Sequence, residues 1–304
     1  MEESSGEEFA LPGKFVMLIY SPVPLRQLKM RPEQFQYTPL RHRSLAVRLP
    51  PAAHYSPAML SPLAAGIYAT ISATGGIGLV TAGFAYASRW PTSQIFGHTL
   101  IAPRIPGQLA LTFDDGPNPA WTPQLLDILA EHNVHATFFM VGKFAKAEPE
   151  LSRRVADAGH LIGNHSWSHP DLSRTRSANV LDELTRTSDI LTGTTGKAVR
   201  YFRPPFGARR PYVLKLARQL GLIPVTWNAM TTDWKEPSAD KIAQNLIRKI
   251  DSNQSRGYAS NIVLHDGSHH GQGANRGPSV AAAEQLLVRY DRTHKFVTLD
   301  AWPE

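Results

Sequence analysis

The chain has 304 residues, of which 42% are hydrophobic and 19% are charged, and this suits one large globular domain with an appended segment. It contains no cysteine, which excludes disulfides and thiolate ligands, so any metal held by side chains must use histidines and carboxylates. The formal net charge of +7 suits an anionic surface such as a cell wall or a membrane, and would also suit nucleic acid.

The first third of the chain differs in composition from the rest. Residues 1–58 are rich in Pro, Arg and Glu without sustained periodicity, and we predict a disordered extension there. Residues 59–88 are predicted to form a transmembrane anchor or a signal segment, because the stretch from Leu63 to Ala87 has no charged residue and is long enough to span a bilayer. Arg41, Arg43 and Arg48 precede it, which favours a cytoplasmic N-terminus and places the rest of the chain outside the cytoplasm.

Three alternatives to an anchor remain open for this apolar stretch. It is compatible with a signal peptide cleaved after Ala87, which would give a secreted protein. It is also compatible with a translation start at Met59, or with a helix packed on a soluble domain. Residues 89–103 are predicted to be a linker to the globular domain that follows, residues 104–304.

From Gln108 onward, apolar runs alternate with amphipathic stretches. The predicted strands cover residues 109–113, 136–142, 161–163, 200–202, 223–227, 262–264 and 296–299. The predicted helices cover residues 123–132, 149–158, 177–192, 211–220, 238–250 and 279–289. This repeat predicts an α/β domain with a parallel sheet over residues 104–304, too short for a complete eight-unit TIM barrel; a flat doubly wound sheet is the alternative.

Two adjacent carboxylates, Asp114 and Asp115, end the first predicted strand. Neighbouring side chains in a strand point to opposite faces, but Gly116 and Pro117 break this alternation and let both carboxylates approach one cavity. One carboxylate would then bind a metal while the other moves a proton. The alternative is an ordinary turn, since Asp-Asp-Gly-Pro is also a good turn sequence.

His165 and His169 are four residues apart. On one helical turn this spacing places both imidazoles on the same face, close enough to share one ion. Together with a carboxylate they complete a set of two histidines and one carboxylate with open coordination positions. A pair of ordinary surface or core histidines is the alternative.

Three further polar residues stand just after hydrophobic runs, namely Arg203, Asp233 and His265. Separately, each has an ordinary explanation as an exposed side chain or a cap. In α/β folds, however, sites are assembled where strands end, so the shared placement predicts one active site. His269 and His270 follow in a polar stretch and are predicted to lie in a solvated loop, with a loop that reaches the site as the alternative.

Five ordered stretches resemble the motifs of the polysaccharide deacetylase family, the NodB-like carbohydrate esterases of family four. They are Thr112 to Pro117, His165 to Pro170, Arg203 to Gly207, Asp233-Trp234 and Ile262 to His265. The resemblance implies a distorted (β/α)7 TIM-like barrel and hydrolysis of N-acetyl groups on N-acetylglucosamine-containing polysaccharide, such as peptidoglycan or chitin oligomers. The alternatives are an O-acetyl esterase acting on xylan and a non-catalytic carbohydrate-binding protein.

The resemblance also assigns the chemical roles. Asp115, His165 and His169 would bind a divalent metal, with zinc expected and cobalt, nickel or iron as alternatives. Asp114 would be the general base and His265 the general acid.

The same resemblance assigns supporting roles. Arg203 would keep Asp114 ionised, and Asp233 would keep His265 charged. The residues expected to bind substrate are Pro205, Phe206, Trp234 and Leu264. One departure from the family pattern, an exchange of aliphatic types at Ile262 and Leu264, affects the expected shape of the acetyl pocket.

The expected partner is therefore an acetylated polysaccharide or oligosaccharide, together with a membrane through residues 63–87. No nucleic-acid partner is expected, because the basic residues are dispersed and no recognised binding module is present. The sequence does not indicate an oligomeric state.

Overall fold

The computed structural model of the protein describes residues 78 and 80–303. The predicted disordered extension and most of the predicted membrane span lie outside these residues. Residues 80–89 are helical. Within the described part of the chain, no helix combines the length and the apolar character needed to cross a bilayer.

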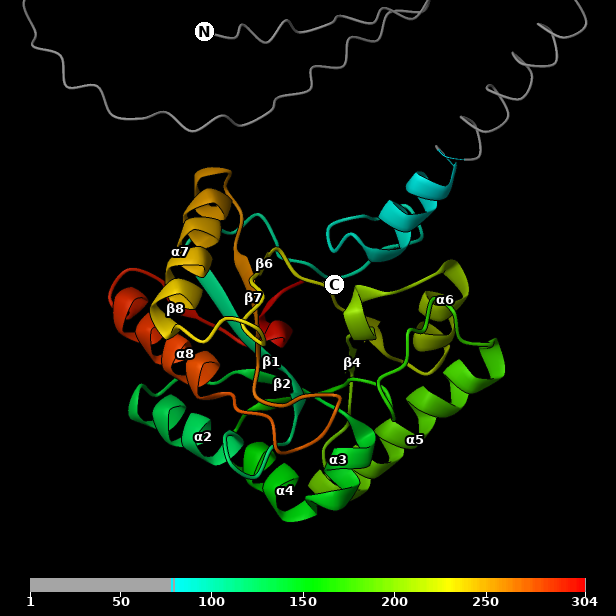
Figure 1. Cartoon of the computed structure of the whole chain (residues 1–304), viewed down its shortest axis with the longest axis horizontal. Coiled ribbons are helices and arrows are strands. Elements are labelled where there is room, and N and C mark those ends of the chain that lie inside the picture. The colour runs from blue at the N-terminus through cyan, green and yellow to red at the C-terminus, as the bar shows by residue number, and fades with distance from the viewer. Residues whose placement is uncertain (1–77, 79, 304) are drawn as a thin grey trace, which may run out of the picture. The chain divides into compact units, whose positions relative to one another are not determined.

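A parallel β-sheet forms the centre of the described domain (Figure 1). Its strands are β1 (Gln108–Gly116), β2 (Thr137–Met140), β3 (Leu161–Asn164), β4 (Tyr201–Phe202), β5 (Ile223–Pro224), β6 (Ala229–Met230), β7 (Ser260–His265) and β8 (Lys295–Phe296). Their order is β5-β4-β3-β2-β1-β7-β6, and β8 pairs with the beginning of β1. The two ends of this order, β5 and β6, follow each other in the chain. The sheet is therefore curled, which confirms the α/β class and is consistent with a distorted barrel.

Helices alternate with the strands along the chain. They are α2 (Thr122–Glu131), α3 (Gly142–Ala147), α4 (Pro149–Asp157), α5 (Ser177–Thr195), α6 (Pro211–Gln219), α7 (Ala239–Ser255) and α8 (Gly277–Tyr290). Proline occupies the first or second position of α2, α4, α6 and α8, where its missing N–H group leaves no hydrogen bond unmade. The sequence did not predict α3 or β6, because elements this short show no periodicity.

Side-chain alternation along β1 separates the core into two layers. Leu109, Leu111 and Phe113 point outward and belong to the large core that the sheet shares with the surrounding helices. Ala110 points inward, into a smaller core that includes Phe139 and Leu100. Every second residue of β1 therefore faces the inner side of the curled sheet, and this is the side on which polar residues gather at the end of the strand.

Residues 89–103, which we expected to form a linker, include side chains buried in the domain. Ser93, Thr99 and Leu100 are all less than a tenth exposed. Leu100 forms a parallel bridge with Val225, directly after β5. This segment therefore continues the sheet beyond β5.

Candidate active site

The end of β1 brings Asp114 and Asp115 to the same side of the sheet. Asp115 has a φ of 72°, and the pairing of β1 with β2 shifts register between Asp114 and Gly116. Asp115 is thus the extra residue of a bulge, and a bulge redirects a side chain that regular alternation would turn away. The break in alternation occurs as expected, although at Asp115 itself and not at Gly116 and Pro117.

His165 and His169 lie in the loop after β3, so the helical turn predicted for them is wrong. Ser166 and His169 have φ values of 63° and 64°, a region that residues other than glycine rarely adopt. Asn164 supports this loop by accepting a hydrogen bond from the Ser166 N–H group at 2.8 Å. The left-handed residues bring the two imidazoles together in place of a helix.

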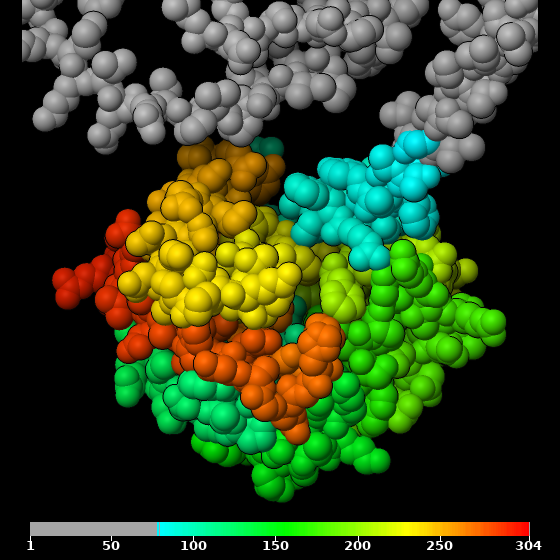
Figure 2. Space-filling view, in the orientation of Figure 1, coloured from blue at the N-terminus to red at the C-terminus, as the bar shows by residue number. Residues whose placement is uncertain are grey.

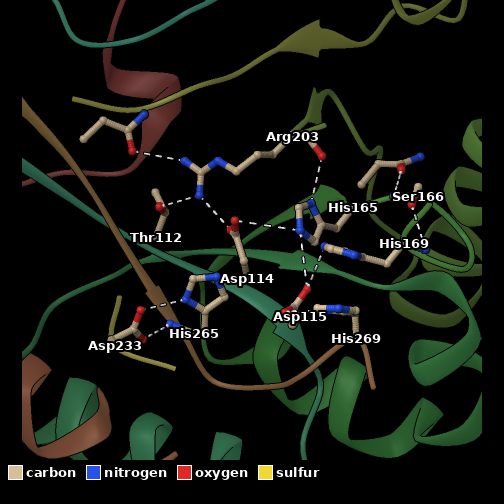
Figure 3. A network of polar contacts seen from close by, with 12 residues as sticks. Thr112, Asp114, Asp115, His165, Ser166, His169, Arg203, Asp233, His265 and His269 are labelled. Atoms are coloured by element: carbon tan, nitrogen blue, oxygen red, sulfur yellow. Dashed lines mark hydrogen bonds and ion pairs between the residues drawn. The ribbon is translucent and has the colours of Figure 1, made fainter. Parts of the chain in front are cut away.

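The imidazoles converge on one oxygen of Asp115 (Figure 3). The Nε2 atoms of His165 and His169 lie 3.5 and 3.1 Å from Asp115 Oδ1. One ligand atom from each of the three residues lies within 4.8 Å of the others. The structure therefore groups the three residues predicted to bind a metal.

The chemistry of these donors fits a divalent ion. Asp115 Oδ1 is buried and has no hydrogen-bond partner. His165 Nδ1 lies 2.8 Å from the carbonyl oxygen of Arg203, which can only accept, so Nδ1 has the hydrogen and Nε2 has the free lone pair. A carboxylate oxygen without a donor, facing imidazole lone pairs, is the arrangement that zinc and similar ions satisfy.

The pKa values of Asp115 and His169 favour the protonation states that metal binding requires. Burial raises the pKa of Asp115, but the neighbouring imidazoles, His269 and His169 foremost, outweigh burial and hold this pKa below its ordinary value. Burial, helped by the nearby His165, lowers the pKa of His169 to about 3. A carboxylate and a neutral imidazole are the forms in which these residues bind a metal.

Asp114 is held by a fully buried arginine. Arg203 Nη1 donates hydrogen bonds to Asp114 Oδ1 and to Thr112 Oγ1, each at 2.7 Å. Arg203 Nη2 donates to Asn261 Oδ1 at 3.1 Å. The sequence analysis missed Thr112 and Asn261 as site residues, although strand alternation places Thr112 on the same face as Asp114.

His265 ends β7, the strand that pairs with β1, and its Cα is the register partner of that of Asp114. Its Nδ1 lies 2.9 Å from Asp233 Oδ1, while Asp233 Oδ2 accepts hydrogen bonds from the His265 N–H group and from Ser279 Oγ. Burial alone would lower the pKa of His265, but the charge and hydrogen bond of Asp233 raise it to about 9. The ring is therefore charged at neutral pH. The sequence analysis missed Ser279.

The two aspartates and three of the histidines, Asp114, Asp115, His165, His169 and His265, line one cavity of about 680 Å³. Phe206 and Trp234, both predicted to bind substrate, are part of its wall, and the Trp234 ring lies 5.0 Å from the His265 ring. Leu264 was predicted wrongly, because it precedes His265 in the strand and so points outward into the helix-covered core. Pro205 is buried and its neighbour Pro204 lines the cavity instead.

His269 is a further residue of this cavity, so the structure supports the alternative of a loop that reaches the site over the favoured solvated loop. Its Nδ1 lies 3.6 Å from Asp115 Oδ2, and its ring stacks on that of His169 with centroids 4.5 Å apart. The sequence analysis favoured a solvated loop because the stretch from Ser268 to Gly277 is polar. Its place directly after β7 was the one available signal, because sites form where such strands end.

Comparison with known proteins agrees with this geometry. Residues 103–225 match the sequence model of a family described as polysaccharide deacetylase. A peptidoglycan N-acetylglucosamine deacetylase of Bacillus cereus is 34% identical over 205 residues, which cover 67% of this chain and 71% of the relative. The chain belongs to the polysaccharide deacetylase family. Asp233 and His265 of this chain lie beyond residues 103–225, the range that the family model matches.

Two further proteins, a deacetylase and a pseudoenzyme, are similar to this chain. A chitooligosaccharide deacetylase of a Bradyrhizobium species is 39% identical over 180 residues, covering 59% of this chain and 78% of the relative. The solved structure of a family 4 pseudoenzyme from Bacillus anthracis matches with a TM-score of 0.60 and 25% identity, over 67% of this chain and 68% of that one. Because one such structure is called a pseudoenzyme, an activity must be argued from the side chains of the site and not from the fold.

Proposed function

We propose that this protein is a metal-dependent deacetylase that removes N-acetyl groups from N-acetylglucosamine residues of a glycan. The observation that supports the proposal most directly is the grouping of Asp115, His165 and His169 in one cavity with Asp114 and His265. A protein that only bound sugar would not need a metal site flanked by a base and an acid.

The metal would be held by Asp115, His165 and His169. When bound, a divalent ion supplies Lewis acidity toward the acetyl carbonyl and the attacking water. Asp114 accepts a proton from this water as the carbonyl carbon is attacked, and the hydrogen bond from Arg203 orients Asp114 for the transfer.

His265 acts at the other end of the reaction. It donates its proton to the amide nitrogen of the sugar as the carbon–nitrogen bond breaks, and acetate and the free amine are the products. A leaving amine needs this proton, and the raised pKa of His265 keeps it available at neutral pH. Asp114 and His265 are register partners on neighbouring parallel strands, so the proposed base and acid lie on the same inner side of the sheet.

The relatives support two glycan substrates. One relative is named for peptidoglycan N-acetylglucosamine and another for chitooligosaccharides. Among these we propose peptidoglycan, because the peptidoglycan deacetylase match covers 67% of this chain, more than the 59% of the chitooligosaccharide deacetylase.

Acetate release tests the proposal. The purified protein is treated with chelator, reconstituted with zinc, cobalt or nickel, and assayed on peptidoglycan, on chitooligosaccharides and on acetylated xylan. We expect acetate from the first two, lost with chelator and restored by metal. Acetate from xylan alone would show an O-acetyl esterase, and no acetate from any substrate would contradict the proposal.

We also propose that the catalytic domain acts outside the cytoplasm. Peptidoglycan lies beyond the cytoplasmic membrane, so an enzyme that deacetylates the mature polymer must be exported. Protease added to intact cells that express the protein should then degrade the catalytic domain, whereas a protected domain would contradict export.

A further inference from the structure

A short segment ahead of the region matched by the family model contacts two loops of the active site. This segment, residues 88–93, is called the N-terminal brace below. It leads from helical residues 80–89 into the turn that precedes Leu100. Figure 2 shows this part of the chain, in cyan, against the yellow-green surface of the region that follows β4.

The first contact is made by Arg209, whose side chain is fully buried. Its guanidinium donates hydrogen bonds to the carbonyl oxygens of Gly207, Trp90 and Ser93 at 2.7 to 2.8 Å. The Arg209 N–H group donates to the carbonyl oxygen of Ser88 at 2.9 Å. Arg209 thus joins three backbone carbonyls of the brace to the loop between β4 and α6, two through its buried guanidinium and one through its backbone N–H group.

That loop forms part of the cavity. Phe206, with a φ of 58°, places its ring 4.6 Å from the ring of His169. At the next residue, Gly207, a Cβ atom would lie 3.0 Å from the Trp227 ring and 3.5 Å from the carbonyl oxygen of Arg89. The brace therefore lies directly against the backbone that positions Phe206.

The second contact is an ion pair to the other loop. Arg89 Nη2 lies 2.5 Å from Asp171 Oδ2, and Asp171 is two residues after His169. The other oxygen of Asp171 accepts hydrogen bonds from the N–H and hydroxyl groups of Ser173. Arg89 thus contacts the loop that contains both histidines of the candidate metal site, at a carboxylate that already orders this loop.

We propose that the N-terminal brace positions the active site, with Arg89 holding the His165 to Asp171 loop and Arg209 holding the Phe206 loop. Both are positioning residues, since neither lines the cavity. The effects on turnover and on zinc binding rest on the proposed function, whereas the effect on backbone exchange does not.

The experiment compares variants of the full chain. Arg89→Glu breaks the ion pair with Asp171. Arg153→Glu is the matched control, because Arg153 is equally exposed, at 45% against 46%, and pairs with Glu150 on α4. Arg209→Lys keeps the charge but removes the planar guanidinium that reaches several carbonyls at once. The measurements are the zinc dissociation constant, amide hydrogen exchange of residues 166–176 and 204–210, the unfolding temperature, and kcat and KM.

For Arg89→Glu we expect the zinc dissociation constant and the exchange rates of residues 166–176 to rise about fivefold over the control. Arg89→Glu and Arg153→Glu should have unfolding temperatures within about 2 °C of each other, since exposed ion pairs contribute little to stability. For Arg209→Lys we expect faster exchange at residues 204–210 and a KM raised more than kcat is lowered.

Arg89→Glu decides the outcome even where Arg209→Lys does not fold. If Arg89→Glu and Arg153→Glu bind zinc equally and exchange residues 166–176 at equal rates, the proposed positioning role of the brace is contradicted. Faster exchange at residues 166–176 in Arg89→Glu, in a chain that releases no acetate, would support the brace while contradicting the proposed deacetylase activity.

Discussion

Asp114 and Asp115 are neighbours in the chain, yet their carboxylates have different surroundings. Asp114 accepts a hydrogen bond from the buried guanidinium of Arg203, whereas Asp115 faces imidazoles and keeps one oxygen without a hydrogen-bond partner. A carboxylate that accepts a hydrogen bond from a buried arginine is fixed in direction, and one with a free oxygen among imidazoles suits a metal. At the scale of single residues, these surroundings separate the base from the ligand.

Asp114→Asn tests this separation. The amide keeps the shape of the carboxylate but cannot accept the proton of water, so we expect kcat to fall by at least about 1,000-fold while zinc binding is retained. His169→Ala, as the comparison, should lose both zinc and activity. Metal content by mass spectrometry and acetate release on the same samples give the two readouts. Parental turnover in Asp114→Asn would show that another group is the base.

Asp233→Asn tests how His265 is kept charged. A general acid must be protonated, so activity falls as pH rises through its pKa, which Asp233 raises to about 9. Removing the charge of Asp233 lowers this pKa, and we expect the alkaline limb of the kcat/KM profile to move down by about 1 to 2 pH units. The measurement is the pH profile on a glycan amide. An unmoved limb would show that His265 is not the titrating acid.

At the scale of elements, helix α8 connects the core to the general acid. Ser279, in its first turn, donates a hydrogen bond to Asp233 at 2.7 Å, and the helix packs through Leu286 and Leu287 into the large core. Burial of this apolar face fixes the helix and with it the hydroxyl group that orients Asp233. The site therefore depends on packing well away from the cavity.

Leu286→Ala should destabilise the domain through this packing. Leu286 is fully buried, so truncation leaves a cavity and we expect the free energy of unfolding to fall by about 2 to 5 kcal/mol. Val288→Ala on the same helix is the control, because Val288 is 64% exposed and its loss should cost less than about 0.5 kcal/mol. Urea unfolding followed by circular dichroism measures both. Equal effects would contradict the assigned orientation of α8.

The same elements show how far the sequence could predict the structure. Long periodic segments such as α5 and α8 were predicted to within a few residues, because their apolar spacing sets which face is buried. The alternation of β7 also contained the information that Leu264 points away from His265, but the family-based assignment overrode it. The left-handed conformations at Ser166 and His169, and the fold of His269 over the site, depend on tertiary contacts that no local pattern encodes.

At the scale of the whole molecule, metal binding should be coupled to stability. The three ligands come from β1 and from the loop after β3, so an ion that binds them favours the folded chain. At a free zinc concentration of 100 times the dissociation constant, the added stability is about 2.7 kcal/mol. Thermal unfolding should shift upward with zinc and back with chelator. His169→Ala should show no shift, and an equal shift in this variant would contradict the ligand set.

The pairing of β1 with β7 has a consequence for the nascent chain. Thr112 and the residue whose carbonyl oxygen it contacts, Ile262, are 150 positions apart, and Asp114 pairs in the same ladder with His265. Ribosomes release the early strands first, so the two aspartates emerge long before their partner strand exists. The candidate site is therefore incomplete until β7, which ends at His265, has been synthesised. Pairing across so long a separation also predicts slow folding, since closing a large loop precedes any gain from the contacts.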